Sequence, residues 1–335
     1  MKKKAAIIIA VLAAVAVAAL VLFDAVRPET FNNSFFSMNT YCSAEVQGRD
    51  AEKSLAEIQS IVEKLDSEVL SRTAENSVVY NLNKNGEAEL DSETATYFSL
   101  LADISAESNG AFDFTLGEVS SLWNFGSAPS VPDKNRLSEA LSHSGYEKVS
   151  LSGNKITLGD KNAAVDFGAS GKGIALDSIK SHLETQKVSR AVVSVGGSVL
   201  LYGKDDFKVG IRDPKGGTGS IATLTTAETC VSTSGNYEQY FEENGKRYHH
   251  ILNPETGYPV DNGLVSVTVI SESGLLTDAL STACFVLGIE EGTQLAEHYG
   301  AKVIFITDEN IIYTDSETKA MLSLTDKNYK LAETE

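Results

Sequence analysis

Apolar residues recur with helical spacing at four places along the chain. In the first, Leu55, Ile58, Val62 and Leu65 fall three or four residues apart, which places them on one face of a helix. Two of the other segments are followed by a glycine suited to ending a helix. The pattern predicts helices over Ala51–Leu70, Asp91–Ile104, Ile174–Gln186 and Leu276–Leu287.

Short runs of alternating apolar and polar residues, bounded by Gly and Asn, predict strands. One hairpin is expected over Val149–Leu158, and a second joins Tyr237–Phe241 to Arg247–Ile251 through Asn244-Gly245. Residues 24–37, which mix polar and aromatic residues, are interpreted as a short tether. Further strands are expected at Ala191–Leu201, Phe207–Ile211, Ile221–Thr225, Leu264–Ile270, Lys302–Ile306 and Ile311–Thr314.

The order of these elements indicates the fold class. Helices and strands are mixed without strict alternation, and several strands follow one another as hairpins. This favours an α+β domain of mixed, mainly antiparallel sheets with packed helices over a doubly wound parallel sheet. No repeat or low-complexity linker divides the chain, so residues 28–330 are predicted to form one domain.

The amino terminus has the pattern of a membrane anchor. Lys2–Lys4 precede an uncharged run from Ala5 to Phe23, which is about the length needed to cross a bilayer. The run has no polar face, which argues against a buried core helix. We expect residues 1–27 to form a single signal anchor, with the body on the extracytoplasmic side of the cell membrane. Cleavage after Ala16-Val17-Ala18 is the alternative, and it also exports the body.

Charge and cysteine content exclude two classes of protein. The formal net charge is −18, and removing the basic amino terminus makes the body more acidic still. Nucleic-acid binding needs clustered Lys and Arg, so we expect no nucleic-acid partner. The chain has three cysteines, Cys42, Cys230 and Cys284, which cannot form a closed disulfide framework.

A glycine-rich segment with one lysine is the first candidate for chemistry. Asp166-Phe167-Gly168-Ala169-Ser170-Gly171-Lys172-Gly173 lies at the start of a predicted helix. There, unpaired backbone N–H groups and an ammonium group can meet a phosphate. The segment is not a P-loop, because Gly173 stands where that motif needs Ser or Thr. An ordinary strand-to-helix turn remains the alternative.

Asp278 and Thr282 form the second candidate. In a helix they lie four residues apart on one face. One carboxylate and one hydroxyl suit a hard cation such as Mg²⁺, which also takes carbonyl oxygens, water and substrate phosphate. The alternative is a helix start in which Asp278 serves only the helix dipole.

Two further segments carry open interpretations. His249 and His250 end a predicted strand, where neighbouring side chains point to opposite faces, so at most one of them faces a given site. The segment Gly110–Gly117, followed by Trp123, could form a wall for a flat aromatic ligand, or it could be plain core.

Taken in order, these segments resemble the FAD:protein FMN transferase (ApbE) family. The resemblance extends from Ser37 to about Gly288. It rests on the following segments: Met38-Asn39-Thr40, Phe112–Gly117, Asp166–Gly168 with Gly171–Gly173, Val195–Gly197, Val209–Pro214, Thr233–Tyr237, His250–Pro259 and Asp278–Thr282.

The resemblance implies a Mg²⁺-dependent catalytic domain with FAD as its substrate. Such an enzyme cleaves FAD, attaches FMN to a Thr or Ser of an FMN-binding acceptor protein and releases AMP. Asp278 and Thr282, with the backbone of Ala169, would hold Mg²⁺. Asp278 would thereby serve catalysis, and His250 would activate the acceptor hydroxyl. The residues implied in FAD contact are Met38, Ala111, Phe112, Asp113, Asp166, Lys172, Ile251 and Leu252.

The sequence departs from the family pattern at two points. Asn39 stands where the family commonly has Gly, and Ser71-Arg72-Thr73 lacks a flavin-contacting Tyr often found there. Two other functions remain as alternatives: an FAD pyrophosphatase that produces FMN and AMP without a protein acceptor, and a non-catalytic flavin carrier. The Asp278/Thr282 pair argues against the carrier.

Overall fold

The structure is a computed structural model that describes residues 29–217 and 219–332. The predicted anchor at residues 1–27 lies outside this range. Within the described residues, no helix combines the length and apolar character needed to cross a membrane.

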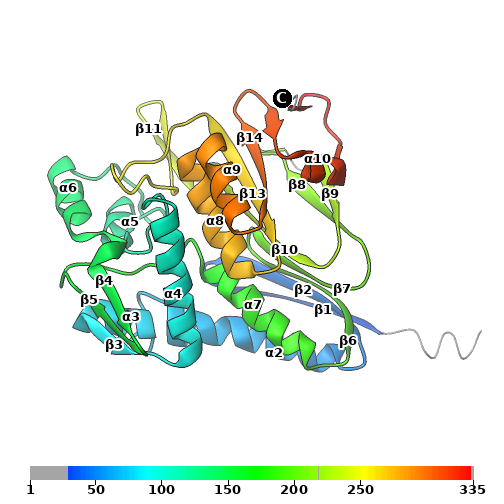
Figure 1. Ribbon diagram of the computed structural model, residues 1–335, viewed down its shortest axis with the longest axis horizontal. Coiled ribbons are helices and arrows are strands. Elements are labelled where there is room, and N and C mark those ends of the chain that lie inside the picture. Colours follow the sequence, from blue (N-terminus) through cyan, green and yellow to red (C-terminus); the bar gives the residue numbers. More distant parts are fainter. Residues whose placement is uncertain (1–28, 218, 333–335) are drawn as a thin grey trace, which may run out of the picture.

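A large, almost entirely antiparallel sheet is the centre of the fold (Figure 1). Only its last pairing, β15 with β17, is parallel. The described part of the chain contributes nine strands to it, in the order β1 (Thr30–Ser37), β2 (Thr40–Gly48), β6 (Val188–Val195), β7 (Ser198–Gly203), β10 (Thr229–Gly235), β13 (Leu264–Ser271), β14 (Lys302–Thr307), β15 (Ile311–Tyr313) and β17 (Lys330–Leu331).

Helices cover one face of this sheet. In β7 and β10, Leu200 and Cys230 point to the helical side, whereas the next residues, Leu201 and Val231, point to the other. Figure 1 shows the elongated helices lying in front of the sheet. They are α2 (Ala51–Lys64), which continues as a π-helix to Leu70, α4 (Ser92–Glu107), α7 (Gly171–Glu184), α8 (Gly274–Leu287) and α9 (Ile289–His298).

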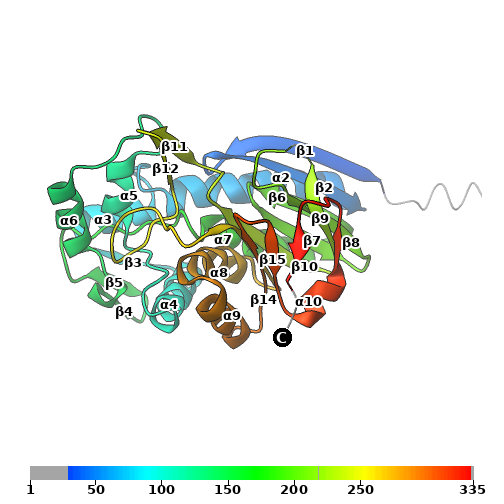
Figure 2. The same cartoon turned by 90° about the horizontal axis from the view of Figure 1, so that it is seen from above.

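A small sheet packs on the opposite face. Phe207 and Leu224 from this sheet share a core with Ile304 and Ile306 of β14. Figures 1 and 2 both place this part on the right of the molecule. Its elements are β8 (Phe207–Arg212), β9 (Ser220–Thr226) and β16 (Leu322–Leu324), with α10 (Ser316–Met321) beside them.

The other end of the molecule is built from short elements (Figure 2). Trp123 is its buried centre and donates a hydrogen bond from Nε1 to the Gly257 carbonyl (2.8 Å). Of the two interpretations of Trp123, the structure thus supports plain core. The elements here are α3 (Val78–Asn85), β3 (Glu87–Glu89), α5 (Gly117–Trp123), α6 (Lys134–His143), β4 (Val149–Ser152), β5 (Lys155–Leu158), β11 (Tyr240–Glu243) and β12 (Lys246–His249), with a 3₁₀ turn over Tyr146–Lys148.

Most predicted elements are confirmed, but two predictions are wrong. Residues 30–37 form strand β1 instead of continuing a tether, because every residue of Thr30–Ser37 pairs with β2. The expected single strand Ala191–Leu201 is a hairpin of β6 and β7. Gly196, with φ of 58°, turns the chain there, a conformation that glycine adopts without steric cost.

Candidate active site

The candidate site is built where the amino-terminal half of α8 crosses the start of α7. The two helices approach closely at Gly173 and Gly274. A Cβ added at Gly173 would stand 2.1 Å from the Gly274 carbonyl oxygen and 2.8 Å from Asp278 Cβ. This contact lets the Gly173 N–H donate to Asp278 Oδ2 (3.0 Å). Glycine at the position that excluded a P-loop is therefore required by helix packing.

Asp278 is the buried anion of the site, with 3% of the residue exposed. Its Oδ1 accepts a hydrogen bond from Ser198 Oγ (3.2 Å) and forms an ion pair with Lys172 Nζ (3.2 Å). Desolvation lowers the pKa of Lys172, but the Asp278 and Glu238 carboxylates outweigh it and raise that pKa above its ordinary value. Lys172 is therefore a permanent positive charge at neutral pH.

The Gly168–Lys172 turn brings a carbonyl oxygen to the same ammonium. Lys172 Nζ lies 3.4 Å from the Gly168 carbonyl oxygen. Asp166 shapes this turn, because its Oδ1 accepts the Gly168 N–H (2.8 Å). Its Oδ2 accepts from Ser120 Oγ (2.9 Å) and lies 3.4 Å from Arg72 Nη1. The predicted phosphate segment is thus held beside Asp278, with Lys172 between them.

The predicted Mg²⁺ ligands have suitable chemistry. Thr282 is half-buried one turn beyond Asp278, and its Oγ1 lies 3.2 Å from Ser234 Oγ. Carboxylate, hydroxyl and main-chain carbonyl oxygens form a hard donor set, and Lys172 shows that a cation is already held between Asp278 and the carbonyl next to Ala169. In residues 29–217 and 219–332, no group of three or more His, Cys, Asp or Glu is placed so that it could hold a metal ion by itself. Mg²⁺ needs no such cage where substrate phosphate completes its shell, so the residues fit.

The two histidines separate as the strand alternation predicts. His249 is buried, and its Nε2 lies 2.8 Å from the Val260 carbonyl oxygen. His250 follows β12 and is half-buried, with Nδ1 3.3 Å from the Gln239 carbonyl oxygen. Burial, the Lys172 charge and His249 lower the pKa of His250 to about 4. His250 therefore belongs electrostatically to the Lys172 cluster and is neutral at pH 7.

Met38 lies in the tight turn between β1 and β2. Met38 and Asn39 have φ values of 49° and 55°, as in the two-residue turns that favour Gly or Asn. Asn39 therefore suits the backbone where the family commonly has Gly. The Met38 N–H donates to Asp66 Oδ2 (2.7 Å), which fixes the turn against the end of α2.

The remaining predicted FAD contacts are mostly buried. Phe112 is 2% exposed, and Ile251 and Leu252 are also core residues, so any contact they make with a ligand would be through the main chain. Asp113 has both carboxylate oxygens engaged by its own surroundings. Ala111 is half-buried beside it. The structure thus gathers Asp166, Ala169, Lys172, His250 and Asp278, but it buries the side chains of these apolar residues.

Sequence reasoning missed three polar residues of this region. Ser198 holds Asp278, and Arg72 donates from Nη1 to the Gly117 carbonyl oxygen (2.6 Å) and pairs with Asp166. Glu238 interacts with Lys172, and desolvation together with Asp278 raises its pKa against the opposing charges of Lys172 and Arg212. The available signal for Glu238 was its position directly after Thr233–Tyr237, one of the segments that carry the resemblance.

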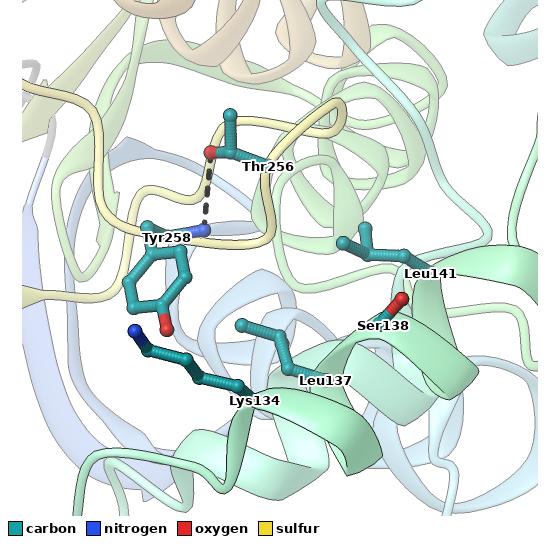
Figure 3. Close-up of a pocket in the computed structure, with 6 residues that line it drawn as sticks. All are labelled: Lys134, Leu137, Ser138, Leu141, Thr256 and Tyr258. Carbon is teal, nitrogen blue, oxygen red and sulfur yellow. Dashed lines mark hydrogen bonds between the residues drawn. The ribbon is translucent and has the colours of Figure 1, made fainter.

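Two surface depressions lie away from this cluster. One of about 450 Å³ lies between α6 and the loop around Gly257 (Figure 3). A second, more polar one lies on the other side of α6 and includes Arg136 and His143. The predicted site residues line neither of them. The charged groups, not cavity size, therefore locate the candidate site.

Comparison with known proteins identifies the family. The ApbE family model matches residues 38–305. A FAD:protein FMN transferase of Treponema pallidum (strain Nichols) is 30% identical over 330 residues, covering 90% of this chain and 89% of that protein. One from Klebsiella pneumoniae (strain 342) is 35% identical over 228 residues, covering 67% and 72%.

Solved structures agree in fold. The crystal structure of the ApbE protein of Thermotoga maritima MSB8 has a TM-score of 0.80 and 29% identity, covering 88% of this chain and 99% of that one. The apo flavinyl transferase ApbE of Pseudomonas stutzeri has a TM-score of 0.76 and 27% identity, covering 88% and 97%. The chain therefore belongs to the ApbE family of FAD:protein FMN transferases.

Proposed function

We propose that this enzyme uses Mg²⁺ to cleave FAD and attaches FMN through a phosphoester bond to a Thr or Ser of an acceptor protein, releasing AMP. The names of the Treponema and Klebsiella relatives support this reaction. The observation that carries it is the position of Lys172, whose ammonium lies between Asp278 and the Gly168 carbonyl at the start of α7. A diphosphate at this helix start would meet the Lys172 ammonium, a charge-assisted hydrogen-bond donor suited to phosphate oxygens.

Binding of the diphosphate is the task of Lys172 and the turn before it. The raised pKa of Lys172 keeps its charge at neutral pH. In a chain of net charge −18 this local positive charge offsets general repulsion of an anionic ligand. Asp278, Thr282 and the Ala169 carbonyl would hold Mg²⁺, which would neutralise charge that develops on the phosphate oxygens.

His250 is suited to receive the proton of the acceptor hydroxyl. Its Nδ1 can donate a hydrogen to the Gln239 carbonyl oxygen, which leaves the Nε2 lone pair available. Because its pKa is about 4, the ring is neutral at pH 7. As the hydroxyl proton passes to Nε2, the hydroxyl oxygen bonds to the FMN phosphorus. The bond from that phosphorus to the bridging oxygen breaks, and AMP leaves.

We further propose that residues 1–27 anchor the enzyme in the cell membrane with residues 28–330 on the extracytoplasmic side. The support is the sequence pattern alone: basic residues, then an uncharged run, then an acidic body. The acceptor would then be a protein exposed on the same side.

The test is a reconstituted transfer reaction. Intact-mass analysis of membrane-fraction proteins, with and without this gene, first identifies the protein that gains the mass of FMN. That purified protein is then incubated with the enzyme, FAD and Mg²⁺, with a parallel reaction in EDTA. We expect the acceptor to gain FMN and AMP to appear in equal amounts, and both to stop in EDTA. AMP release without an acceptor mass gain would instead identify a pyrophosphatase, and intact bound FAD would identify a carrier.

A further inference from the structure

Two exposed aromatic side chains lie together on the β1–β2 hairpin, at the end of the sheet that carries the candidate site. Phe36 is 70% exposed and Tyr41 is 64% exposed, the highest values among the large exposed hydrophobic residues of the described chain. They face each other directly across β1 and β2. Tyr240, the next most exposed, is covered by Arg247, whose guanidinium lies 4.1 Å from the ring centre. Phe36 and Tyr41 therefore form an aromatic pair with an unusually open surface.

The aromatic pair interrupts an otherwise polar strand face. Phe35 and Cys42, the neighbouring pair, point to the helical side and join its core. Phe36 and Tyr41 therefore point to the opposite side, together with the exposed Ser34. Within the described residues, the small sheet of β8, β9 and β16 shares its core with β7, β10, β13 and β14 but with no residue of β1 or β2. This part of the sheet face is left open.

The chain connects the aromatic pair to the candidate site over a short path. The Gly196 N–H donates to the Tyr41 carbonyl oxygen (3.1 Å). Two residues later, Ser198 Oγ donates to Asp278 Oδ1. Because an extended residue spans about 3.5 Å, the Tyr41 main chain and Asp278 are on the order of 10–15 Å apart, with the Tyr41 ring on the sheet face opposite α7 and α8.

The segment that carries the aromatic pair is itself uncharged, although the Asp66 carboxylate accepts hydrogen bonds from Ser37 Oγ and the Met38 N–H at its turn. Residues 30–44 contain no Asp, Glu, Lys or Arg, although 22% of the chain is charged and its net charge is −18. Open aromatic surface costs solvation free energy and marks contact with another molecule. A protein whose hydroxyl must reach Asp278 and His250 has to touch the enzyme next to them.

From these observations we infer that Phe36 and Tyr41 form the docking surface for the acceptor protein, and that they contact apolar side chains flanking its reactive Thr or Ser. This inference rests on the proposed function. The contact is apolar, so the affinity for the acceptor depends little on ionic strength. Aromatic residues are frequent hot spots, and loss of such a pair commonly costs tenfold or more in affinity.

The experiment compares the double variant Phe36→Thr/Tyr41→Thr with the unaltered enzyme, using the acceptor identified by its FMN mass gain. Thr was chosen as the replacement because, like Phe and Tyr, it favours strand structure. We expect the KM for the acceptor to rise about tenfold or more, with an unchanged FAD affinity and kcat. The control Leu151→Thr alters another exposed strand residue, on β4, and should leave the KM unchanged. Phe36→Tyr/Tyr41→Phe should retain the unaltered KM.

Each outcome of this experiment supports or overturns the docking surface. An unchanged acceptor KM in a double variant that binds FAD normally would overturn the docking surface. If sedimentation then shows loss of a dimer, the pair binds a second copy; if binding to anionic vesicles is lost, it binds lipid. A loss of FAD affinity would make the pair structural and also overturn the inference. Failure of the unaltered enzyme to transfer FMN would refute the proposed function itself, which is a separate result.

Discussion

Asp278 and Asp113 are two poorly exposed carboxylates that differ in what surrounds them. Asp278 projects from α8 toward another helix and faces the Lys172 ammonium at 3.2 Å. Asp113 lies in the loop before α5. Its Oδ1 accepts from the backbone N–H and hydroxyl of Thr115 (2.8 and 2.6 Å), and its Oδ2 accepts the Tyr146 N–H (3.2 Å). Burial raises the pKa of Asp113, whereas Asp278 has a cation beside it.

We propose that this contrast separates a carboxylate suited to chemistry, Asp278, from one that stabilises the fold, Asp113. The hydrogen bonds that Asp113 accepts in the structure all come from nearby residues, Thr115 and Tyr146, so removal of its carboxylate should destabilise the fold more than it lowers activity. Asp278 joins two helices and also holds a charge that a phosphate ligand would share. The resemblance implied both residues in the site, but their hydrogen-bond and ion-pair partners favour different roles.

Asp278→Asn should have the largest effect. The amide oxygen can still accept the Gly173 N–H, but the negative charge is lost. We expect FMN transfer to fall about a hundredfold or more, as for removal of a single preorganised electrostatic group, and the folded state to persist. Initial transfer rates and circular dichroism measure both. A rate equal to that of the unaltered enzyme would end the catalytic assignment.

Asp113→Ala should affect stability instead. The N–H groups of Thr115 and Tyr146 lose their acceptors, which should lower the free energy of unfolding by about 1–3 kcal/mol. Urea denaturation measures this loss. We expect kcat of the folded variant to stay within about threefold of the unaltered value. Lost FAD affinity at unchanged stability would place the Asp113 carboxylate in the binding site and break the comparison.

Lys172→Met tests the cation that distinguishes the two carboxylates. Removing the ammonium should weaken FAD binding about tenfold, because a charge-assisted contact to the diphosphate is lost. Flavin fluorescence titration measures the affinity. Lys180→Met is the matched control, since Lys180 lies on the same helix and donates to the Glu272 carbonyl oxygen. Equal affinities in both variants would remove Lys172 from the site.

His250 supplies the smallest expected effect. Its pKa is lowered from 6.5 to about 4, so between these values the unfolded chain binds more protons than the folded one. Its contribution to stability is therefore fully present above about pH 6.5 and is lost as the pH falls toward 4. When the pH is lowered from 7 to 4.5, the free energy of unfolding should fall in both proteins. The fall should be about 1 kcal/mol smaller in His250→Gln than in the unaltered enzyme. Equal drops, measured by denaturant unfolding, would show that His250 titrates normally.

The sequence predicted those elements that carry their own periodic signal. The amphipathic pattern from Ala51 and the hairpin around Gly153 are local, and both are confirmed. Strand β1 was missed because it is the edge of its sheet, and because a polar residue on its inner side, Asn33, and an aromatic one on its outer side, Phe36, obscure its alternation. The β6–β7 hairpin was missed because strand-forming residues stand directly on both sides of the short turn at Gly196, so the run was interpreted as one strand.

Prediction of the site residues was limited in the same way, because only local sequence signals were available. Lys172 and Asp278 were found because each lies in a segment with recognisable chemistry. Ser198 and Glu238 were not found, because their roles depend on contacts with α7 and α8 that only the folded chain makes. In the sequence, Arg72 was named only because its segment lacks a Tyr that the family often has there. The structure shows that its guanidinium contacts both the Asp166 carboxylate and the Gly117 carbonyl oxygen at the start of α5.

The close approach of Gly173 and Gly274 links catalysis to helix packing. One added methyl at either position would meet the carbonyl oxygen of the other glycine at 2.1 or 2.4 Å. The helices would have to separate, and the Asp278 carboxylate would move away from the Lys172 ammonium. Two residues that have no functional group thus set the spacing of the charges, and a mutational screen would rank them with the reactive side chains although neither side chain could touch a substrate.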